Sequence, residues 1–311
     1  MALSRELPHS FREAIAMARQ ILSANHDLVA KNLIDTEAEQ LVVAAYRHAT
    51  GTMLSRLQLF SRLQDRFPDA SGEKLLIMAM GRTEGKPLQH LTGFQTFLEH
   101  EYDVGPDVLV PRPETELLVV TAIEHLEARG RVPAFGIEIG LGSGAIATEL
   151  LWRFSKLRMA ATELVLAAEK RARSNADRIL GSGPDGSERL KIFRPQAPLE
   201  VWEPLLGFHG RGADFIISNP PYMIHSDPIE ADVLAHEPKT ALYAPEADPV
   251  HFYRKIEEGA AVFLAPDGMV FLEIPIERSQ TIEKLFAKPE WQVKVLRDLT
   301  NRDRIVVAQR T

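Results

Sequence analysis

From Phe135 to the end of the chain, short apolar runs of strand length alternate with longer segments of helical spacing. Predicted strands cover 135–140, 157–162, 191–194, 214–218 and 269–274, and predicted helices cover 145–154, 165–180 and 252–264. Strands separated by helices favour a parallel, doubly wound α/β sheet, because parallel neighbours need a long crossover between them. The last two runs, 292–296 and 304–309, predict a closing antiparallel β-hairpin.

The first 95 residues have a different pattern and are expected to form a helical bundle. Helical spacing covers 11–24, 54–67 and 73–81, and Thr36–Glu39 has the spacing of a capping box that starts another helix. We therefore expect three parts: a helical domain over 1–95, a linker or hairpin over 96–112, and an α/β domain over 113–311.

Composition excludes several classes of site. The chain has 311 residues, no Cys and a net charge of −7. Without Cys there are no disulfides, thiolate zinc sites, iron–sulfur clusters or Cys nucleophiles. The acidic balance argues against nucleic acid as the substrate. The ten His show no metal-ligand spacing, and there is no signal peptide and no apolar run of about 18 residues. We expect a cytoplasmic protein with no metal and no membrane partner.

A glycine-rich stretch, Glu138-Ile-Gly-Leu-Gly-Ser-Gly144, lies between the first predicted strand of the α/β part and the following helix. Gly140, Gly142 and Gly144 permit a tight turn and let a ligand approach backbone N–H groups at the start of a helix. The spacing is G-x-G-x-G, whereas dinucleotide enzymes use G-x-G-x-x-G. This favours a nucleoside with a short zwitterionic tail over a pyrophosphate; a plain strand–helix turn is the alternative.

Glu163 stands at the end of the second predicted strand. An acid there can accept two hydrogen bonds from vicinal ribose hydroxyls, as in nucleotide-binding α/β sheets. A helix-capping or solvated Glu is the alternative. Because ligands of such sheets bind at the carboxyl ends of the strands, the glycine stretch, Glu163 and Asn219 are expected around one crevice.

Asn219-Pro-Pro-Tyr222 follows the predicted strand 214–218 directly. The side-chain carbonyl of Asn219 and the backbone carbonyl of Pro220 can each accept one hydrogen of a planar –NH2 group. Tyr222 can stack on that plane. Two rigidly held acceptors orient the nitrogen lone pair, so this segment predicts chemistry on an amide or an exocyclic amine.

Taken in order, these motifs resemble the release-factor-specific group of the HemK-type protein-(glutamine-N5) methyltransferases. The similarity extends over most of the chain: 85–93, 108–116, 139–147, 174–176, 218–223, 236–242, 252–256 and 303–307. It implies a class I methyltransferase domain preceded by a substrate-engaging helical domain. It also implies S-adenosyl-L-methionine as cofactor and, as substrate, the glutamine of a Gly-Gly-Gln loop in a peptide chain release factor.

The resemblance also assigns residues to roles. Cofactor contacts are implied for Gly140, Leu141, Gly142, Ser143, Gly144, Glu163 and Asn219. Catalysis and substrate binding are implied for Asn219, Pro220, Pro221 and Tyr222, with Arg112 as a further substrate contact.

Three alternatives remain open from the sequence. A sister group methylates a ribosomal-protein glutamine, although Pro113-Glu-Thr115 favours the release-factor group. The Asn-Pro-Pro-Tyr segment also serves adenine-N6 methyltransferases of nucleic acids, which need a positive surface. The third alternative is a binding protein that has lost the cofactor or uses it weakly. It arises because several positions differ from the family pattern: Glu138, Leu141, Glu163 and the segment 194–198. In that segment, Gln196 could stand as a neutral replacement for the acid near the adenine.

Overall fold

The computed structural model describes residues 6–197, 199–205, 212–228 and 231–311. The chain divides into two compact units, Met1–Phe94 with Glu230–His236 and Gln95–Ile229 with Glu237–Thr311. Each unit has an apolar core of its own, one in the first unit and one on each face of a sheet in the second.

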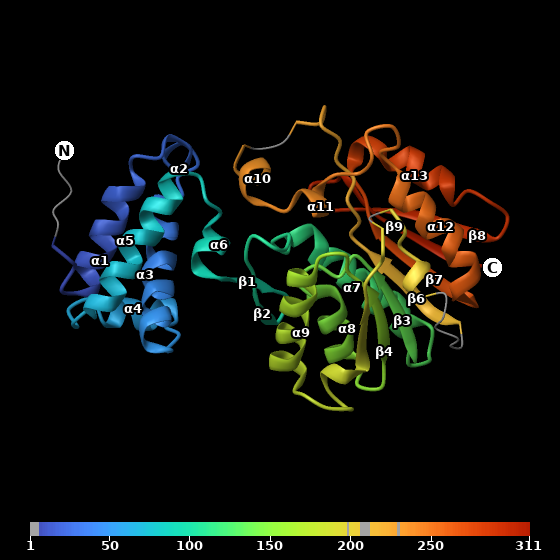
Figure 1. Cartoon of the computed structure of the whole chain (residues 1–311), viewed down its shortest axis with the longest axis horizontal. Helices are drawn as coiled ribbons and strands as arrows, with labels where there is room; N and C mark the ends of the chain where they lie inside the picture. Colours follow the sequence, from blue (N-terminus) through green and yellow to red (C-terminus); the bar gives the residue numbers. More distant parts are fainter. Residues whose placement is uncertain (1–5, 198, 206–211, 229–230) are drawn as a thin grey trace. The chain divides into compact units, whose positions relative to one another are not determined.

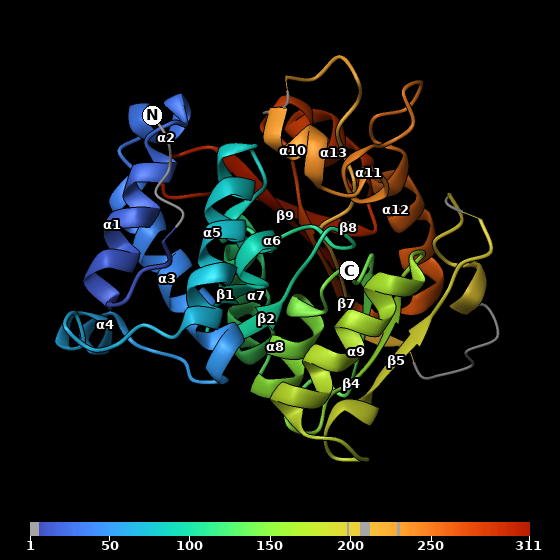
Figure 2. The ribbon, with the colours of Figure 1, turned by 60° about the vertical axis from the view of Figure 1, so that its left-hand side comes forward.

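The first unit is helical. Its helices are α1 (Phe11–Leu22), α2 (His26–Ala30), α3 (Ile34–Thr50), α4 (Arg56–Ser61), α5 (Asp69–Thr83), α6 (Leu88–Thr92) and α10 (Ala231–His236). The three longest, α1, α3 and α5, pack against one another, as Figures 1 and 2 show. Phe11, Leu41 and Leu75, one from each helix, are buried in the shared core, as the helical spacing of the apolar residues predicts.

The capping box expected at Thr36–Glu39 is wrong. Helix α3 begins two residues earlier, at Ile34, and no side chain caps it. The reason lies in the preceding turn, where Asn32 adopts φ 56° and ends α2 so tightly that the next helix starts at once. Glu39 instead accepts a hydrogen bond from Arg56 Nε at 2.8 Å.

The helix expected over 54–67 is shorter than predicted, and it carries the capping box that the sequence reasoning missed. Helix α4 covers only Arg56–Ser61. Ser55 Oγ accepts from the Gln58 N–H at 3.2 Å, and Gln58 Oε1 accepts from the Ser55 N–H at 2.8 Å. A Ser followed three residues later by Gln is the sequence signal for this arrangement.

The second unit contains a seven-stranded sheet. Its strands are β3 (Phe135–Ile139), β4 (Arg158–Thr162), β5 (Leu190–Phe193), β6 (Ala213–Ser218), β7 (Leu264–Glu273), β8 (Trp291–Arg297) and β9 (Asp303–Arg310). Their spatial order is β5-β4-β3-β6-β7-β9-β8. Neighbours from β5 to β7 are parallel, whereas β9 is antiparallel to both β7 and β8. The predicted doubly wound sheet with an antiparallel C-terminal hairpin is confirmed. A separate two-stranded sheet pairs β1 (Phe94–Phe97) with β2 (His100–Asp103).

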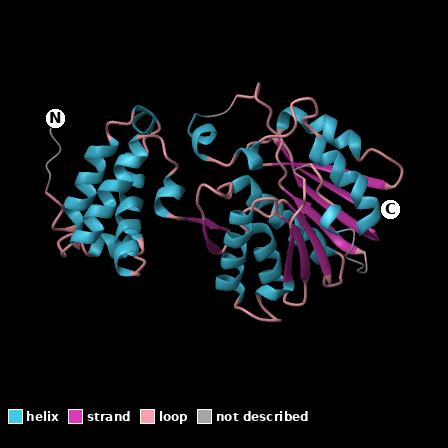
Figure 3. Cartoon of the chain, in the orientation of Figure 1, coloured by secondary structure: helices cyan, strands magenta, loops and turns pink. Residues whose placement is uncertain are grey.

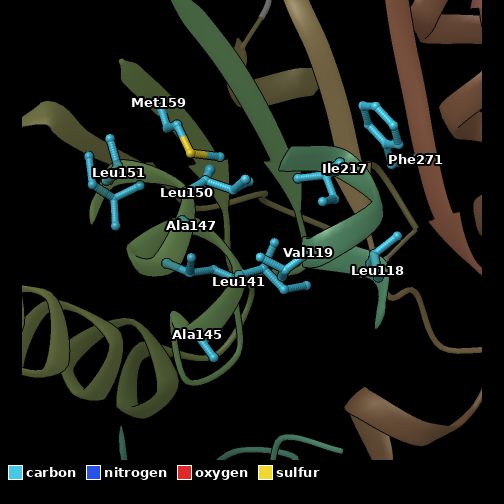
Figure 4. Close-up of a cluster of buried hydrophobic side chains, with 14 of the residues drawn as sticks. Leu118, Val119, Leu141, Ala145, Ala147, Leu150, Leu151, Met159, Ile217 and Phe271 are labelled. Carbon is cyan, nitrogen blue, oxygen red and sulfur yellow. The ribbon is translucent and has the colours of Figure 1, made fainter. Parts of the chain in front are cut away.

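Helices cover both faces of the large sheet, so its strands lie between two helical layers in Figure 3. One layer holds α7 (Pro113–Ala128), α8 (Ala145–Arg153) and α9 (Leu166–Leu180), and the other holds α12 (His251–Phe263) and α13 (Ser279–Leu285). Short elements are α11 (Lys239–Leu242) and the 3₁₀ turns η1 (Ser187–Arg189), η2 (Glu203–Leu205) and η3 (Ile276–Arg278). Figure 4 shows the core under the first layer, where Leu118 and Val119 of α7 and Leu150 of α8 face Ile217 and Phe271 of the sheet.

The sheet register brings the chemistry-bearing segments to one edge. Ile139 of β3 is aligned with Thr162 of β4, and Ser218 of β6 is aligned with Leu272 of β7. Since these four strands are parallel, their carboxyl ends lie side by side. After β3 the chain moves outward to β4 and β5 and then returns to β6 on the other side of β3. This reversal of strand order is the position where doubly wound sheets bind ligands.

Candidate active site

The glycine loop leaves β3 in a backbone conformation that Gly adopts without strain. Gly140, Gly142 and Gly144 have φ angles of 77°, 55° and 81°, all in the left-handed region. The N–H groups of Gly140 and Leu141 both donate to the Thr162 carbonyl at the end of β4, at 3.1 and 3.0 Å. The loop is therefore anchored to the neighbouring strand just before α8 begins.

Side chains around the loop hold it from behind. Leu141 is buried and lies near Val119 and Ala145 in the core (Figure 4). The Ser143 carbonyl accepts a hydrogen bond from Asn175 Nδ2 at 3.0 Å. Because Asn175 lies on α9, this bond joins the loop to the next helix.

Glu163 connects the loop to the end of β4. Its Oε2 accepts from the Gly142 N–H and its Oε1 from the Val165 N–H, both at 2.8 Å. Burial raises the pKa of the Glu163 carboxyl, and the hydrogen bonds from Val165 and Gly142 offset part of that effect. Each carboxylate oxygen has a second lone pair, so Glu163 can hold the loop and still accept hydrogen bonds from a ligand.

Asn219 lies just beyond β6, with its side-chain amide held at the nitrogen end. Its Nδ2 donates to Thr115 Oγ1 at 3.1 Å, and that hydroxyl donates to Glu273 Oε2 at 2.7 Å. Within the described part of the chain, no hydrogen bond is found to Asn219 Oδ1. The strand below is fixed in turn, since Ser218 Oγ donates to the Ile139 carbonyl at 2.6 Å.

The segment after Asn219 is rigid and mostly enclosed. Pro220 is buried, and Pro221 and Tyr222 are half-buried. Burial raises the pKa of Tyr222 to about 12, so its hydroxyl stays protonated at neutral pH. Met223 then pairs its backbone with the chain near Tyr243, which secures the far end of the segment.

A cavity of about 1080 Å³, counting its part open to solvent, occupies this edge of the sheet. The predicted site residues that line it are Gly140, Leu141, Gly142, Ser143, Glu163, Asn219, Pro220 and Pro221. Apolar side chains complete it, among them Leu164, Val201 and Phe252. Three further residues expected at the site do not line this cavity, although the structure describes them: Gly144, Tyr222 and Arg112.

Arg112 forms an ion pair with Glu237, whose side chain is 1% exposed. Burial raises the pKa of Glu237, and the positive charge of Arg112 offsets part of that rise. Pro238 and Thr240 follow directly and line the cavity. The ion pair thus anchors the chain segment that forms one wall.

The residues that depart from the family pattern have distinct environments. Glu138 is fully buried, and neither of its carboxylate oxygens makes a hydrogen bond of normal geometry. Burial raises the pKa of Glu138 well above the ordinary value, and the nearby Ala147 amide, which lowers this pKa, offsets only part of the rise. In the segment 194–198, Arg194 forms an ion pair with Glu169, Gln196 is exposed and away from the cavity wall, and Pro198 lies outside the described residues.

Two residues of this site were given no role by the sequence reasoning. In the sequence, Thr115 belongs to the 108–116 motif and Glu273 to a predicted strand, and neither pattern predicts a contact for these side chains. A signal for Glu273 existed, because it is the single acid in the apolar run Met269–Ile274, just as Glu163 follows the apolar end of β4. Their partnership joins α7 to β7 over 158 residues of sequence, so no local pattern reveals it.

Neither a metal centre nor a membrane span is found in the described ranges. No three His, Cys, Asp or Glu side chains gather there in a metal-binding arrangement. No helix there combines the length and the apolar character that crossing a bilayer requires.

The strand order with its antiparallel last pair, together with a glycine loop and an Asn-Pro-Pro-Tyr segment at the carboxyl edge, defines a class I methyltransferase. No family model matches the chain. The release factor glutamine methyltransferase of Burkholderia pseudomallei is 35% identical over 240 residues, covering 76% of this chain and 80% of that protein. The protein of the same name from Bacteroides thetaiotaomicron is 32% identical over 231 residues, covering 73% and 77%. The chain belongs to the release factor glutamine methyltransferase family, which confirms the resemblance read from its motifs.

Among solved structures, similarity is found to a release factor-specific protein-(glutamine-N5) methyltransferase from Alicyclobacillus acidocaldarius. The two chains are 26% identical, the match covers 67% of this chain and 99% of that one, and the TM-score is 0.42.

Proposed function

We propose that this protein transfers a methyl group from S-adenosyl-L-methionine to the side-chain amide nitrogen of a glutamine. We propose as substrate the glutamine of the Gly-Gly-Gln loop of a peptide chain release factor, in the cytoplasm. Membership of the family supports both the reaction and the substrate.

The observation that carries the proposal is the orientation of Asn219. Its Nδ2 is held by Thr115, so its Oδ1 is the end left to accept a hydrogen bond. The Pro220 carbonyl has no backbone partner among the described residues. Two acceptors on a rigid segment suit the two hydrogens of an amide –NH2 group. Holding both N–H bonds directs the nitrogen lone pair and stabilises the positive charge that develops on nitrogen.

The cavity fits a nucleoside that carries an amino-acid tail. The Glu163 carboxylate, which keeps lone pairs beyond its bonds from Gly142 and Val165, supplies polar contacts, and the Leu164 and Val201 side chains supply an apolar wall. When bound, S-adenosyl-L-methionine supplies an electrophilic methyl group. The role proposed for Glu163 is to accept hydrogen bonds from the ribose hydroxyls.

We also propose that the helical part, residues 1–95, engages the protein substrate, and that Tyr222 lies against the plane of the bound amide. The ion pair of Arg112 with Glu237 supports an indirect role for Arg112, in which it shapes the cavity wall near the substrate.

Asn219→Ala tests the proposal in an assay with radiolabelled S-adenosylmethionine and purified release factor. Methylation is expected to fall to background, and calorimetry with S-adenosylhomocysteine separates this loss from any accompanying loss of cofactor affinity. Gln292→Ala is the matched control, because it removes an exposed side-chain amide on β8. Near wild-type turnover in Asn219→Ala would contradict the role of Asn219.

The same measurements separate two of the alternatives, adenine-N6 methylation and a binding protein, from the proposed function. Methylation of duplex or single-stranded DNA, with none of release factor, would instead support adenine-N6 chemistry. No heat with S-adenosylhomocysteine at millimolar concentration would instead support a binding protein.

A further inference from the structure

We infer that Thr115 and Glu273 are positioning residues that fix which end of the Asn219 amide faces the substrate. This inference rests on the proposed function, since it assumes that the cavity receives an amide –NH2 group. It assigns to α7 and β7 a part in selecting the chemical group that is methylated.

The direction of the hydrogen-bond chain follows from its terminal group. An ionised carboxylate can only accept, so Thr115 must donate its single hydroxyl hydrogen to Glu273. The Thr115 oxygen can then only accept from Asn219. Asn219 must therefore present Nδ2 to Thr115. Rotating the amide by 180° would set two acceptors against each other.

Burial makes this constraint effective. Thr115 is 5% exposed and Glu273 is 3% exposed, so water does not compete for their hydrogen bonds. The backbone of Glu273 is also held, because the hydroxyl of the buried Tyr253 donates to its carbonyl at 2.9 Å. The terminal acceptor is thus fixed in place beneath Asn219.

The consequence is selectivity for a hydrogen-bond donor. With Oδ1 toward the cavity, Asn219 accepts from the –NH2 of a glutamine and is opposed by the oxygens of a glutamate. A freely rotating Asn219 could present either end. Loss of the hydrogen bonds that link Asn219, Thr115 and Glu273 is expected to lower kcat/KM for release factor about tenfold, which corresponds to the free energy of one hydrogen bond.

The direction of the hydrogen bonds from Asn219 through Thr115 to Glu273 also depends on pH. Burial raises the pKa of Glu273 to about 7, and its hydrogen bond from Thr115 offsets part of the rise. The other charged or titratable groups that face Glu273 are Arg304, Glu114, Arg112, Tyr222 and Tyr253. Above this pKa the carboxylate is an acceptor only. Below it Glu273 gains a proton to donate, and the direction of the chain is no longer imposed.

Thr115→Val and Thr115→Ser test the inference as a pair. The Val variant keeps the shape and removes the hydroxyl, whereas the Ser variant keeps the hydroxyl. Kinetics with release factor, calorimetry with S-adenosylhomocysteine and the ¹⁵N side-chain amide signal of Asn219 are measured for both variants and the wild type. Asn219→Ala assigns that signal by its loss.

Thr115→Val is expected to lower kcat/KM about tenfold and to shift the hydrogen-bonded Asn219 proton upfield, with the cofactor-product Kd within about twofold of wild type. Thr115→Ser is expected to restore both readouts. Glu273→Gln is expected to remove the pH dependence of kcat/KM near pH 7 and to hold kcat/KM about tenfold below the wild-type value at pH 8, because a Gln amide can both accept from and donate to Thr115 at every pH. A variant that merely loosened the fold would lower the rate equally at all pH values.

An Asn219 amide signal that is unchanged in Thr115→Val would overturn the inference, whatever the kinetics. If Glu273→Gln fails to fold, the Thr115 pair still decides. A different result would contradict the proposed function: wild-type protein that shows the Asn219 amide signal but does not methylate release factor.

Discussion

Glu163→Gln is expected to weaken binding of S-adenosylhomocysteine even though the two side chains have nearly the same shape. In the wild type both carboxylate oxygens accept backbone N–H bonds, from Gly142 and Val165. A Gln side chain has one oxygen and one –NH2 group, so one of these two N–H groups must face a donor. The glycine loop or the start of α9 then loses its anchor.

The magnitude follows from that single mismatch. Leaving one largely buried N–H without an acceptor costs about 1–3 kcal/mol. If binding must restore the loop, the same free energy is lost from the affinity. Because about 1.4 kcal/mol is a factor of ten, the Kd is expected to rise about 5- to 140-fold.

Isothermal titration calorimetry with S-adenosylhomocysteine measures this change directly. Glu188→Gln is the matched control, because Glu188 is an exposed acid between α9 and β5. A Kd for Glu163→Gln within about twofold of the control would refute the reasoning, since it would show that the loop does not depend on the Glu163 bonds.

The remaining predictions concern stability. Glu37→Gln should destabilise the helical unit by about 1.5–3 kcal/mol in urea unfolding, because it removes the nearly buried carboxylate that accepts two hydrogen bonds from the Arg82 guanidinium, at 2.7 and 3.1 Å. Asp35→Asn, in an exposed ion pair of the same helix as Glu37, should cost under about 1 kcal/mol. Burial raises the pKa of the Glu138 carboxyl well above 4.5 in the folded protein. The unfolded protein therefore loses the Glu138 proton at a lower pH than the folded protein does, and wild-type stability should fall as the pH rises above about 4.5. Glu138→Gln should therefore stabilise the protein more at pH 8 than at pH 5, whereas exposed Glu124→Gln should show no such difference; an equal effect at both pH values would contradict this.

The position of the site could be predicted because segments that follow parallel strands all lie at the same edge of the sheet. Each candidate segment follows an apolar run, so Gly140, Glu163 and Asn219 had to meet at the carboxyl edge once those runs were strands. The local details were less secure. The start of α3 at Ile34 depended on the tight turn at Asn32, which the Thr36–Glu39 spacing does not show.

The sequence by itself determined the class of chemistry. The spacing of the glycines and the stiff Asn-Pro-Pro-Tyr segment are local properties of the backbone, and they persist wherever the chain places them. Only the tertiary structure decided how Asn219 is oriented. That orientation depends on Thr115 and Glu273, which come from distant parts of the chain and whose hydrogen bonds acquire a fixed direction only when packing removes water.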